Sequence, residues 1–488
     1  MKLIFQGHDY RYAVEQSLLA FFPDERPVYE GDEESCAHVT LSEENGLHTA
    51  VTVLTIDGKT ASGSSSLDVS DAKDEYERER LLQRIVKLSF FEAARSLTGV
   101  TPAWGALTGI RPAKLAASIM EEGNSAEETD RILRETYFVS EPRRRLAIEC
   151  AEAGINAERD LAPNDISLYL GIPFCPTRCA YCSFVSNSVE KSFHLVEPYL
   201  EALFREIDSA AALTRDLGLN IKSFYMGGGT PTTLTAEQMS RLLERLNTRF
   251  DLSRVVEYTV EAGRPDTITA DKLLALKAGG VSRVSINPQS MEDRVLSAIG
   301  RRHSADDIRS AMELVNKVGF PHVNMDLIAG LPEDTPEGFR RTLDEVIAFG
   351  TDNLTIHTLS LKKGSRITLE GTRIPEVDEV AAMLDYADPT LRRADFAPYY
   401  LYRQKYMSGS FENVGWCKEG GTGWYNIYIM EELHTILSLG AGGSTKLVDT
   451  TNNRIERVFN LKYPKEYIDR AEKIEENQKA VRLFYSNR

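Results

Sequence analysis

The 488-residue sequence has no apolar run long enough to cross a bilayer, and only six of its residues are cysteine. Without such a run the chain is not expected to span a membrane. Six cysteines in a chain of this length are too few for a disulfide framework. The first residues, MKLIFQGHDY, lack the continuous apolar core of a secretory signal. We therefore expect a cytoplasmic protein without a membrane span.

Positive charge is also scarce: the sequence has 57 Lys and Arg against 73 Asp and Glu, which gives a formal net charge of -16. Proteins that bind nucleic acid usually present a basic surface, so this balance argues against a nucleic-acid partner. An anionic ligand would need a local basic pocket. The 42% apolar and 27% charged fractions are typical of a globular protein, and the length allows two or three domains.

Changes in local pattern divide the chain into four predicted segments. Residues 1–75 combine short strands, one helix and the turn signals Gly46 and Gly58, which predicts a small α+β domain. Residues 76–160 show apolar residues at helical spacing, which predicts a helical segment. Residues 161–370 alternate between strand and helix patterns, and residues 371–488 form a mixed α+β C-terminal lobe.

The third segment contains six β-rich runs separated by amphipathic stretches of helical length. This alternation predicts an α/β fold with a parallel sheet, a TIM-like partial barrel of six βα units where a complete barrel has eight. The runs are ISLYLGI (166–172), IKSFYM (221–226), VEYTVEA (256–262), SRVSIN (282–287), PHVNMDLI (321–328) and NLTIHTL (353–359).

Functional groups occur at or just after the end of each run. In parallel βα folds ligands bind at the carboxyl ends of the strands, here called the carboxyl edge, so these groups are expected to lie together. In chain order they are a cysteine loop (residues 175–182), the segment GGGTP (227–231), Glu261, Gln289, Asp326 and His357.

The cysteine loop contains Cys175, Cys179 and Cys182 in the spacing C-x3-C-x2-C. Three thiolates from one loop suit an iron-sulfur cubane in which one iron stays open to an exogenous ligand. The alternative is a structural zinc ion, whose fourth ligand would come from elsewhere in the chain. The residues that could supply it are Cys417, His194 and His357. Cys417 itself is expected to be a buried thiol, with a redox role as the alternative.

The glycine segment and two acidic residues suggest a small polar ligand beside the cysteines. Consecutive glycines after a strand let the backbone approach a ligand closely, although a tight turn before Pro231 explains them as well. Glu261 and Asp326 suit a ribose diol if they face the same cavity. The alternative for each of these acids is a helix cap or a surface ion pair.

Together these residues resemble a known family. The cysteine spacing followed by GGGTP resembles the radical S-adenosylmethionine (SAM) superfamily, in which three cysteines hold a 4Fe-4S cluster whose open iron binds SAM. More narrowly, the chain resembles the oxygen-independent coproporphyrinogen III oxidase family, and its long N-terminal extension resembles the HemZ-type branch. The stretches that carry this are YLGIPFCPTRCAYCSF, YMGGGTPTTL, RVSINPQSM, NMDLIAGLPEDT and IGRRHSADDI.

The resemblance implies a partial (β/α)6 radical SAM barrel and a role for each matching residue. The three cysteines would ligate the cluster, and Tyr169, Arg301 and Asp326 would act in catalysis. One SAM is expected, and a second molecule is left open because Gln289, Arg301 and Asp326 match positions around it. The residues implied to bind cofactor are Tyr169, Tyr181, Gly228, Gly229, Thr230, Glu261, Gln289, Arg301 and Asp326.

The implied activity is that of a radical SAM oxidoreductase of heme and porphyrin biosynthesis, converting coproporphyrinogen III to protoporphyrinogen IX by oxidative decarboxylation. Its partners would be an anionic tetrapyrrole substrate and an electron donor such as flavodoxin or ferredoxin. Basic residues on or after the barrel segments suit the substrate carboxylates, with solvated surface charge as the alternative. They are Arg301, Arg302, Lys362, Lys363 and Arg366.

Two positions depart from the best-described coproporphyrinogen oxidases. Gly171 stands where they have histidine, and Phe184 stands where they have a further cysteine. A heme-chaperone branch, the HemW type, also lacks that cysteine, so a heme-binding chaperone is the first alternative function. A radical enzyme acting on RNA is the second. The aromatic stretch 396–428 could face a macrocycle, with core packing as the alternative.

Overall fold

The computed structural model describes residues 1–23, 25–31, 33–182, 187–360, 367, 373–404 and 408–487. The chain forms two compact units, which are described separately. The first contains Met1–Ile148 and Arg403–Phe411, and the second contains Glu149–Tyr402 and Glu412–Arg488. The predicted segment boundaries after residues 75, 160 and 370 stay predictions.

The first unit is built on a four-stranded sheet in the order β1-β2-β3-β4. β1 runs parallel to β2, and the other pairs are antiparallel. The two hairpin turns, Asn45-Gly46 and Asp57-Gly58, have positive φ at both residues, as tight hairpin turns require. These elements confirm the predicted strands and turn signals. The strands are β1 (Lys2–Gln6), β2 (Cys36–Glu44), β3 (Leu47–Ile56) and β4 (Lys59–Asp68).

Helices pack on this sheet and complete the first unit. The longest, α2 (Glu75–Thr98), begins where Asp74 accepts a hydrogen bond from the Glu77 amide and ends at Gly99 in the left-handed conformation. Its apolar side meets the sheet in a core that includes Leu3, Val39, Leu54 and Phe90. The other helices are α1 (Arg11–Phe21), α3 (Pro112–Glu121), α4 (Ala126–Glu135) and α5 (Glu141–Arg159), which continues into the second unit.

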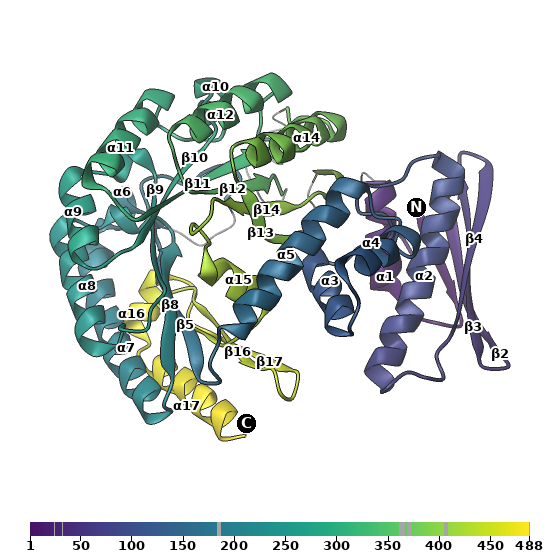
Figure 1. Ribbon diagram of the computed structural model, residues 1–488, viewed down its shortest axis with the longest axis horizontal. Coiled ribbons are helices and arrows are strands. Elements are labelled where there is room, and N and C mark those ends of the chain that lie inside the picture. The colour runs from purple at the N-terminus through teal and green to yellow at the C-terminus, as the bar shows by residue number, and fades with distance from the viewer. Residues whose placement is uncertain are drawn as a thin grey trace. The chain divides into compact units, whose positions relative to one another are not determined.

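The second unit contains the six predicted strands side by side (Figure 1). Within this set each strand is parallel to the next, and the six follow one another in chain order across the sheet. The prediction of six parallel βα units is therefore confirmed. Their bounds are β5 (Asp165–Ile172), β8 (Asn220–Gly228), β9 (Glu257–Gly263), β10 (Arg283–Gln289), β11 (His322–Ala329) and β12 (Asn353–Thr358).

Strands from the C-terminal region extend the same sheet at both of its edges, giving eleven strands in all. β13 (Ala397–Tyr402) and β14 (Asn413–Cys417) add to β12 in an antiparallel arrangement. β15 (Ile436–Leu439) lies parallel to β5. Beyond it follow β16 (Ser444–Asp449) and β17 (Arg454–Phe459). Among the described strands the sheet is open and does not close into a barrel.

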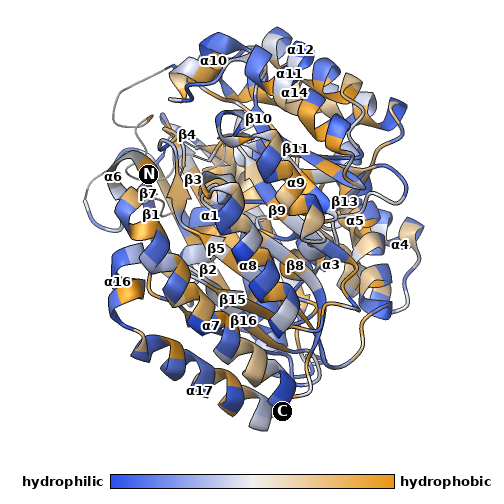
Figure 2. Cartoon of the chain, turned by 90° about the vertical axis from the view of Figure 1, so that its left-hand side faces the viewer, coloured by the Kyte–Doolittle hydropathy of each residue, from blue (hydrophilic) through white to orange (hydrophobic). Residues whose placement is uncertain are grey.

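Helices connect the parallel strands, and their ends carry the expected capping residues. Thr235 and Gln238 form a capping box at α8, and Ser304 and Asp307 form one at α11. α7 and α8 alternate hydrophobic and hydrophilic residues, as Figure 2 shows. The principal helices are α7 (Val196–Asp216), α8 (Ala236–Arg249), α9 (Ala270–Ala278), α10 (Asp293–Ala298), α11 (Ala305–Val318), α12 (Pro336–Ala348), α14 (Val377–Arg393), α15 (Trp424–Glu431), α16 (Pro464–Asp469) and α17 (Glu472–Ser486).

No helix in the described parts of the chain is both long enough and apolar enough to cross a membrane.

One glycine in the sheet is required by a neighbouring ring. Tyr400 on β13 pairs with Gly415 on β14, and a Cβ at position 415 would overlap the Tyr400 ring. We predict that Gly415→Ala lowers the free energy of unfolding by about 1–3 kcal/mol, because the core must move to accept one methyl group. Chemical denaturation measures this. The matched control is Gly109→Ala, where an added Cβ meets no atom within 4 Å. Equal effects of the two substitutions would contradict the prediction.

Candidate functional site

The cysteine loop begins directly after β5 and is fixed at both ends by backbone pairing. The two-residue strands β6 (Phe174–Cys175) and β7 (Asn187–Ser188) are parallel partners. Further along the loop, the Ala180 amide donates to the Ile299 carbonyl at 3.0 Å. Cys175, Cys179 and Cys182 form no disulfide, and each is partly exposed. Among the described residues, no three His, Cys, Asp or Glu side chains are grouped to hold a single metal ion.

The glycine segment packs against the residues that lead into the cysteine loop. The Gly229 amide donates to the Ile172 carbonyl at 2.8 Å, and the Thr230 amide donates to the Phe174 carbonyl at 2.7 Å. A Cβ at Gly229 would lie 2.5 Å from that Phe174 oxygen, so only glycine fits here. These two amides are therefore engaged by the protein itself. The Thr230 hydroxyl faces the Cys175 sulfur at 3.5 Å.

A buried arginine connects the second half of the loop to the end of β10. Arg301 is 8% exposed and donates to the Tyr181 hydroxyl at 3.1 Å and to the Asn287 carbonyl. The Cys179 thiol lies close enough to interact with the same guanidinium. Gln289 follows with a positive φ of 69°, and its buried Oε1 has no hydrogen-bond partner in the described structure. Such an orphan acceptor is a group that a ligand can satisfy.

Acidic side chains from β9 and β11 form a second group at the carboxyl edge. The Tyr225 hydroxyl donates to Glu261 Oε1 at 2.6 Å. Asp326 Oδ1 accepts from the Asn324 amide group at 2.9 Å, and His357 Nε2 lies 3.9 Å from Asp326 Oδ2. Burial, partly offset by the hydrogen bond from Tyr225, raises the pKa of Glu261 to about 7, and the Asp326 charge acts in the same direction as burial.

Three tyrosine rings stack beside this acidic group. Tyr225 lies 4.6 Å from the Tyr425 ring and 6.3 Å from the Tyr169 ring, with interplanar angles of 22° and 12°. The Tyr169 hydroxyl also lies against Gly228, where an added Cβ would be 3.3 Å from it. Sequence reasoning selected Tyr169 but missed Tyr225, although the alternation in SFYMGGG places that side chain on the same face as the glycines that follow.

Most of the predicted site residues thus fall into two neighbouring groups. Gly227 lies between them. It belongs to the glycine segment, and a Cβ at this position would be 2.9 Å from the Glu261 carboxylate. The first group holds the cysteine loop, Tyr181, Thr230 and Arg301. The second holds Tyr169, Glu261 and Asp326.

Several residues that the sequence singled out lie elsewhere. Cys417, on β14, belongs to a core cluster with Tyr399, Tyr400, Tyr425 and Tyr428, which is the packing role expected for the aromatic stretch. His194 is exposed in a short 3-10 turn, and Arg302 is exposed after α10. Phe184, Lys362, Lys363 and Arg366 lie outside the described residues.

The structure accounts for glycine at position 171. The Tyr199 hydroxyl donates to the Gly171 carbonyl at 2.6 Å, and the Ala441 amide donates to the same hydroxyl at 3.0 Å. A Cβ at 171 would lie 3.2 Å from the Ala441 carbonyl oxygen, which is closer than ordinary contact. The segment after β15 therefore occupies the space that a larger residue at 171 would need.

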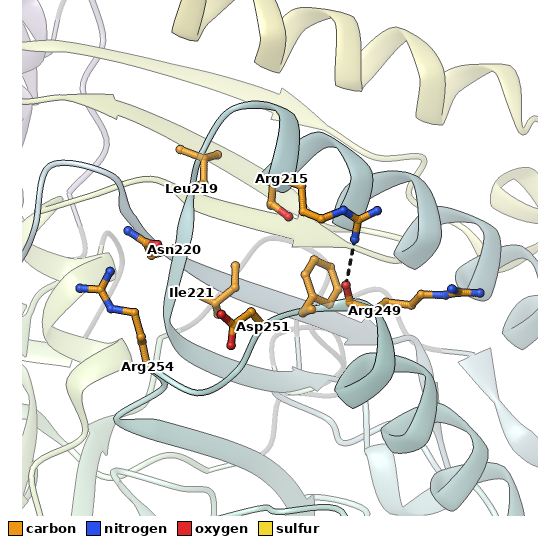
Figure 3. A pocket seen from close by; sticks show the side chains of 9 residues that line it. Arg215, Leu219, Asn220, Ile221, Arg249, Asp251 and Arg254 are labelled. Atoms are coloured by element: carbon orange, nitrogen blue, oxygen red, sulfur yellow. Dashed lines mark hydrogen bonds between the residues drawn. The ribbon is translucent and has the colours of Figure 1, made fainter.

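A small pocket of about 100 Å³ lies at the opposite, amino end of β8, away from these groups (Figure 3). Arg215 donates there to the Arg249 carbonyl at 3.2 Å. The pocket lacks every predicted site residue. Its lining residues are Thr214, Arg215, Leu219, Asn220, Ile221, Arg249, Phe250, Asp251 and Arg254.

Comparison with known proteins first defines the class. Residues 169–346 match the Radical SAM superfamily. The solved structure of coproporphyrinogen III oxidase (HemN) from Escherichia coli, a radical SAM enzyme, shares the fold with a TM-score of 0.53 at 23% identity, over 66% of this chain and 72% of that chain. The predicted fold class is thereby confirmed, including the partial barrel.

Two protein relatives were compared, and the family follows from the first of them. The oxygen-independent coproporphyrinogen-III oxidase-like protein HemZ of Bacillus subtilis is 37% identical over 403 residues, covering 82% of this chain and 80% of HemZ. The heme chaperone HemW of Haemophilus influenzae is 27% identical, covering 66% of this chain and 82% of HemW. The chain belongs to the HemZ-type oxygen-independent coproporphyrinogen III oxidase-like family of the radical SAM superfamily.

Members of this superfamily use a 4Fe-4S cluster and SAM, which are therefore the cofactors of this protein. The donor chemistry of the site fits them. Three thiols on one loop, none of them in a disulfide, suit iron, and the buried Gln289 oxygen, which has no hydrogen-bond partner among the described residues, suits a polar ligand.

The raised pKa of Glu261 predicts a pH dependence of stability. An unfolded Glu ionises near its ordinary pKa of about 4.5, whereas folded Glu261 keeps its proton up to about 7. The unfolded state thus binds fewer protons between these values, so Glu261 makes the protein less stable as pH rises from about 5 to 7, by up to about 3 kcal/mol. Urea unfolding of the cofactor-free protein at several pH values should show a smaller loss in Glu261→Gln. Exposed Glu237→Gln should follow the wild type, and identical profiles for all three proteins would contradict the prediction.

Proposed function

We propose that this protein catalyses the oxygen-independent oxidative decarboxylation of coproporphyrinogen III to protoporphyrinogen IX. The observation that carries the proposal is the grouping of the cysteine loop, the glycine segment and the acidic pair at one carboxyl edge. The identity to HemZ supports the choice within the superfamily, because its 403 aligned residues extend well beyond 169–346.

In this proposal Cys175, Cys179 and Cys182 hold the cluster. The residues that would contact SAM are Tyr169, Tyr181, Gly228, Gly229, Thr230 and Glu261, with Gln289, Arg301 and Asp326 available to the same molecule or to a second one. When bound, the cluster and SAM supply the one-electron chemistry that removes a hydrogen atom from a substrate propionate. The propionate then loses carbon dioxide and one electron and becomes a vinyl group.

The protein's own contribution is to orient ligands and exclude water. Glu261 and Asp326 offer acceptor oxygens for hydroxyl or amino groups, and burial raises the pKa of Glu261 to about 7. The stacked rings of Tyr169, Tyr225 and Tyr425 form an apolar wall beside these acids. Apolar surroundings exclude water and lower the local dielectric constant, which strengthens polar contacts made there. Catalytic roles for Tyr169, Arg301 and Asp326 belong to this proposal.

The substrate would be an anionic tetrapyrrole, and an electron donor such as flavodoxin or ferredoxin would supply reducing equivalents. The net charge of -16 means that the substrate carboxylates need local cations. Arg301 is a buried cation beside the cysteine loop. An electron acceptor must also take up the electron that the decarboxylated substrate releases.

A heme-binding chaperone is the second candidate, favoured by the relationship to a protein named heme chaperone HemW. It would keep the cluster site without decarboxylation. The HemW relationship covers less of this chain than the HemZ relationship and is weaker in identity.

Turnover by the anaerobically reconstituted protein distinguishes the two functions. With SAM, a strong one-electron reductant and coproporphyrinogen III, we expect 5'-deoxyadenosine together with the divinyl product, detected by liquid chromatography and mass spectrometry. Cleaved SAM with intact tetrapyrrole would refute the decarboxylase. Stoichiometric heme binding in a spectroscopic titration, with the tetrapyrrole left intact, would establish the chaperone instead.

Replacing single cysteines tests which thiols hold the cluster. Cys175→Ala, Cys179→Ala and Cys182→Ala should each lose most of the bound iron and the visible absorption of the cluster after reconstitution, because each removes one thiolate ligand. Cys417→Ala is the matched control, since its thiol lies in the core cluster and faces Thr422. Full cluster content in any of the three loop variants would exclude that residue as a ligand.

A further inference from the structure

A second buried arginine lies behind the first half of the cysteine loop. Arg264 follows β9, three residues after Glu261, and is only 3% exposed. A fully buried arginine is rare unless it is paired, so its partners indicate its task. None of the residues assigned to cofactor binding above is among those partners.

Arg264 bridges a carboxylate and the cysteine loop with its planar fork. Its Nη1 donates to Thr177 twice, to the hydroxyl at 2.7 Å and to the carbonyl at 3.1 Å. Its Nε and Nη2 donate to the two oxygens of Asp266 at 3.0 and 2.9 Å. Thr177 stands midway between Cys175 and Cys179, so this contact fixes the chain between two of the loop thiols.

A histidine from the segment after α10 lies next to Asp266. His303 Nδ1 lies 3.7 Å from Asp266 Oδ1, and the His303 side chain is fully buried. Burial alone would raise the pKa of Asp266, but its interactions with His303 and Arg264 outweigh burial and hold that pKa well below its usual range. The carboxylate is thus charged, as bidentate pairing with arginine requires.

We propose that Arg264 is a positioning residue that sets the conformation of the cysteine loop through Thr177, with Asp266 orienting its guanidinium. The inference rests on the proposed role of the three loop cysteines as cluster ligands. Outer partners of this kind hold ligands in place, and losing one typically weakens metal retention by roughly 10-fold or more.

The geometry explains why arginine is needed here. A guanidinium presents donors in fixed directions and can serve Asp266 and Thr177 together, whereas a lysine ammonium is a single point at the end of a flexible stem. Arg301 donates a hydrogen bond to Tyr181 in the second half of the loop, so the two arginines contact opposite halves of it. Together they place two buried cations beside the loop.

The test measures iron retention by the reconstituted full-length protein, without any tetrapyrrole. We expect Arg264→Lys to release iron to an excess of chelator roughly 10-fold faster than the wild type. Thr177→Val, which removes a single hydrogen bond and preserves shape, should release it about fivefold faster. Arg341→Lys is the control, because Arg341 is an exposed arginine of the same unit that pairs with Glu292. It should release iron at the wild-type rate.

Two further measurements separate positioning from a general structural role. The thermal midpoints of the cofactor-free variants should stay close to that of the wild type. The electron paramagnetic resonance spectrum of the reduced cluster should broaden in Arg264→Lys, because the cysteine ligands then adopt several conformations instead of one. Wild-type iron release in both variants would overturn the proposal. So would a fall in the cofactor-free thermal midpoint that accounts for the faster release.

Failure of this proposal can be distinguished from failure of the proposed function. If loop-cysteine variants lose the cluster but Arg264→Lys keeps it firmly, positioning by Arg264 fails and the ligand assignment stands. If the cysteine variants keep the cluster, the ligand assignment fails first. Decarboxylase turnover is a separate assay that neither result decides.

Discussion

The hydrogen bonding between β5 and β8 continues past the ends of both strands, and the candidate site depends on that continuation. Ile172 pairs with Gly228 at the last register position. The next amides along, those of Gly229 and Thr230, then donate to the Ile172 and Phe174 carbonyls. Because the two segments stay hydrogen-bonded beyond the strands, the cysteine loop begins in direct contact with the glycine segment. This pairing brings the Thr230 hydroxyl to the Cys175 sulfur.

Charge is distributed unevenly around the site. Buried Arg264 and Arg301 face the cysteine loop, whereas Glu261 and Asp326 come from β9 and β11 and lie beside the tyrosine stack. In a protein with a net charge of -16, cations placed behind the thiols have to be built in by burial and specific pairing. Each guanidinium therefore donates hydrogen bonds to groups of the protein. Arg264 donates to the Asp266 carboxylate and to Thr177. Arg301 donates to the Tyr181 hydroxyl and the Asn287 carbonyl.

The six parallel strands could be predicted because each is a short, apolar run followed by a functional or glycine residue. The same logic found Glu261, Gln289 and Asp326 on these strands. It could not find Arg264 or its contact with Thr177, because nothing in EAGRPD shows which side of the chain will face a loop 87 positions earlier. The glycine segment illustrates a subtler limit. Sequence reasoning related Gly229 to a ligand, while the structure shows that its neighbouring carbonyls already require glycine.

Pairing between distant segments was also invisible in the sequence. Nothing local indicates that β14 will add to β12 or that β15 will add to β5, since short apolar strands carry little information about their partners. The raised pKa of Glu261 has the same origin, because it depends on burial in the folded chain and then on Tyr225 and Asp326 from other strands. The residue types in the sequence indicated the kind of site. The neighbours that change the pKa of a site residue are identified only in the folded chain.

The contact between Gly171 and the turn after β15 links two parts of the chain that could otherwise vary separately. A Cβ at Gly440 would lie 2.5 Å from the Gly171 carbonyl oxygen, just as one at Gly171 would crowd Ala441. A side chain at either position therefore requires the backbone of the other segment to move, whichever residue stands there. A chimeric protein that carries histidine at position 171 therefore needs a turn after β15 whose backbone leaves room for that side chain.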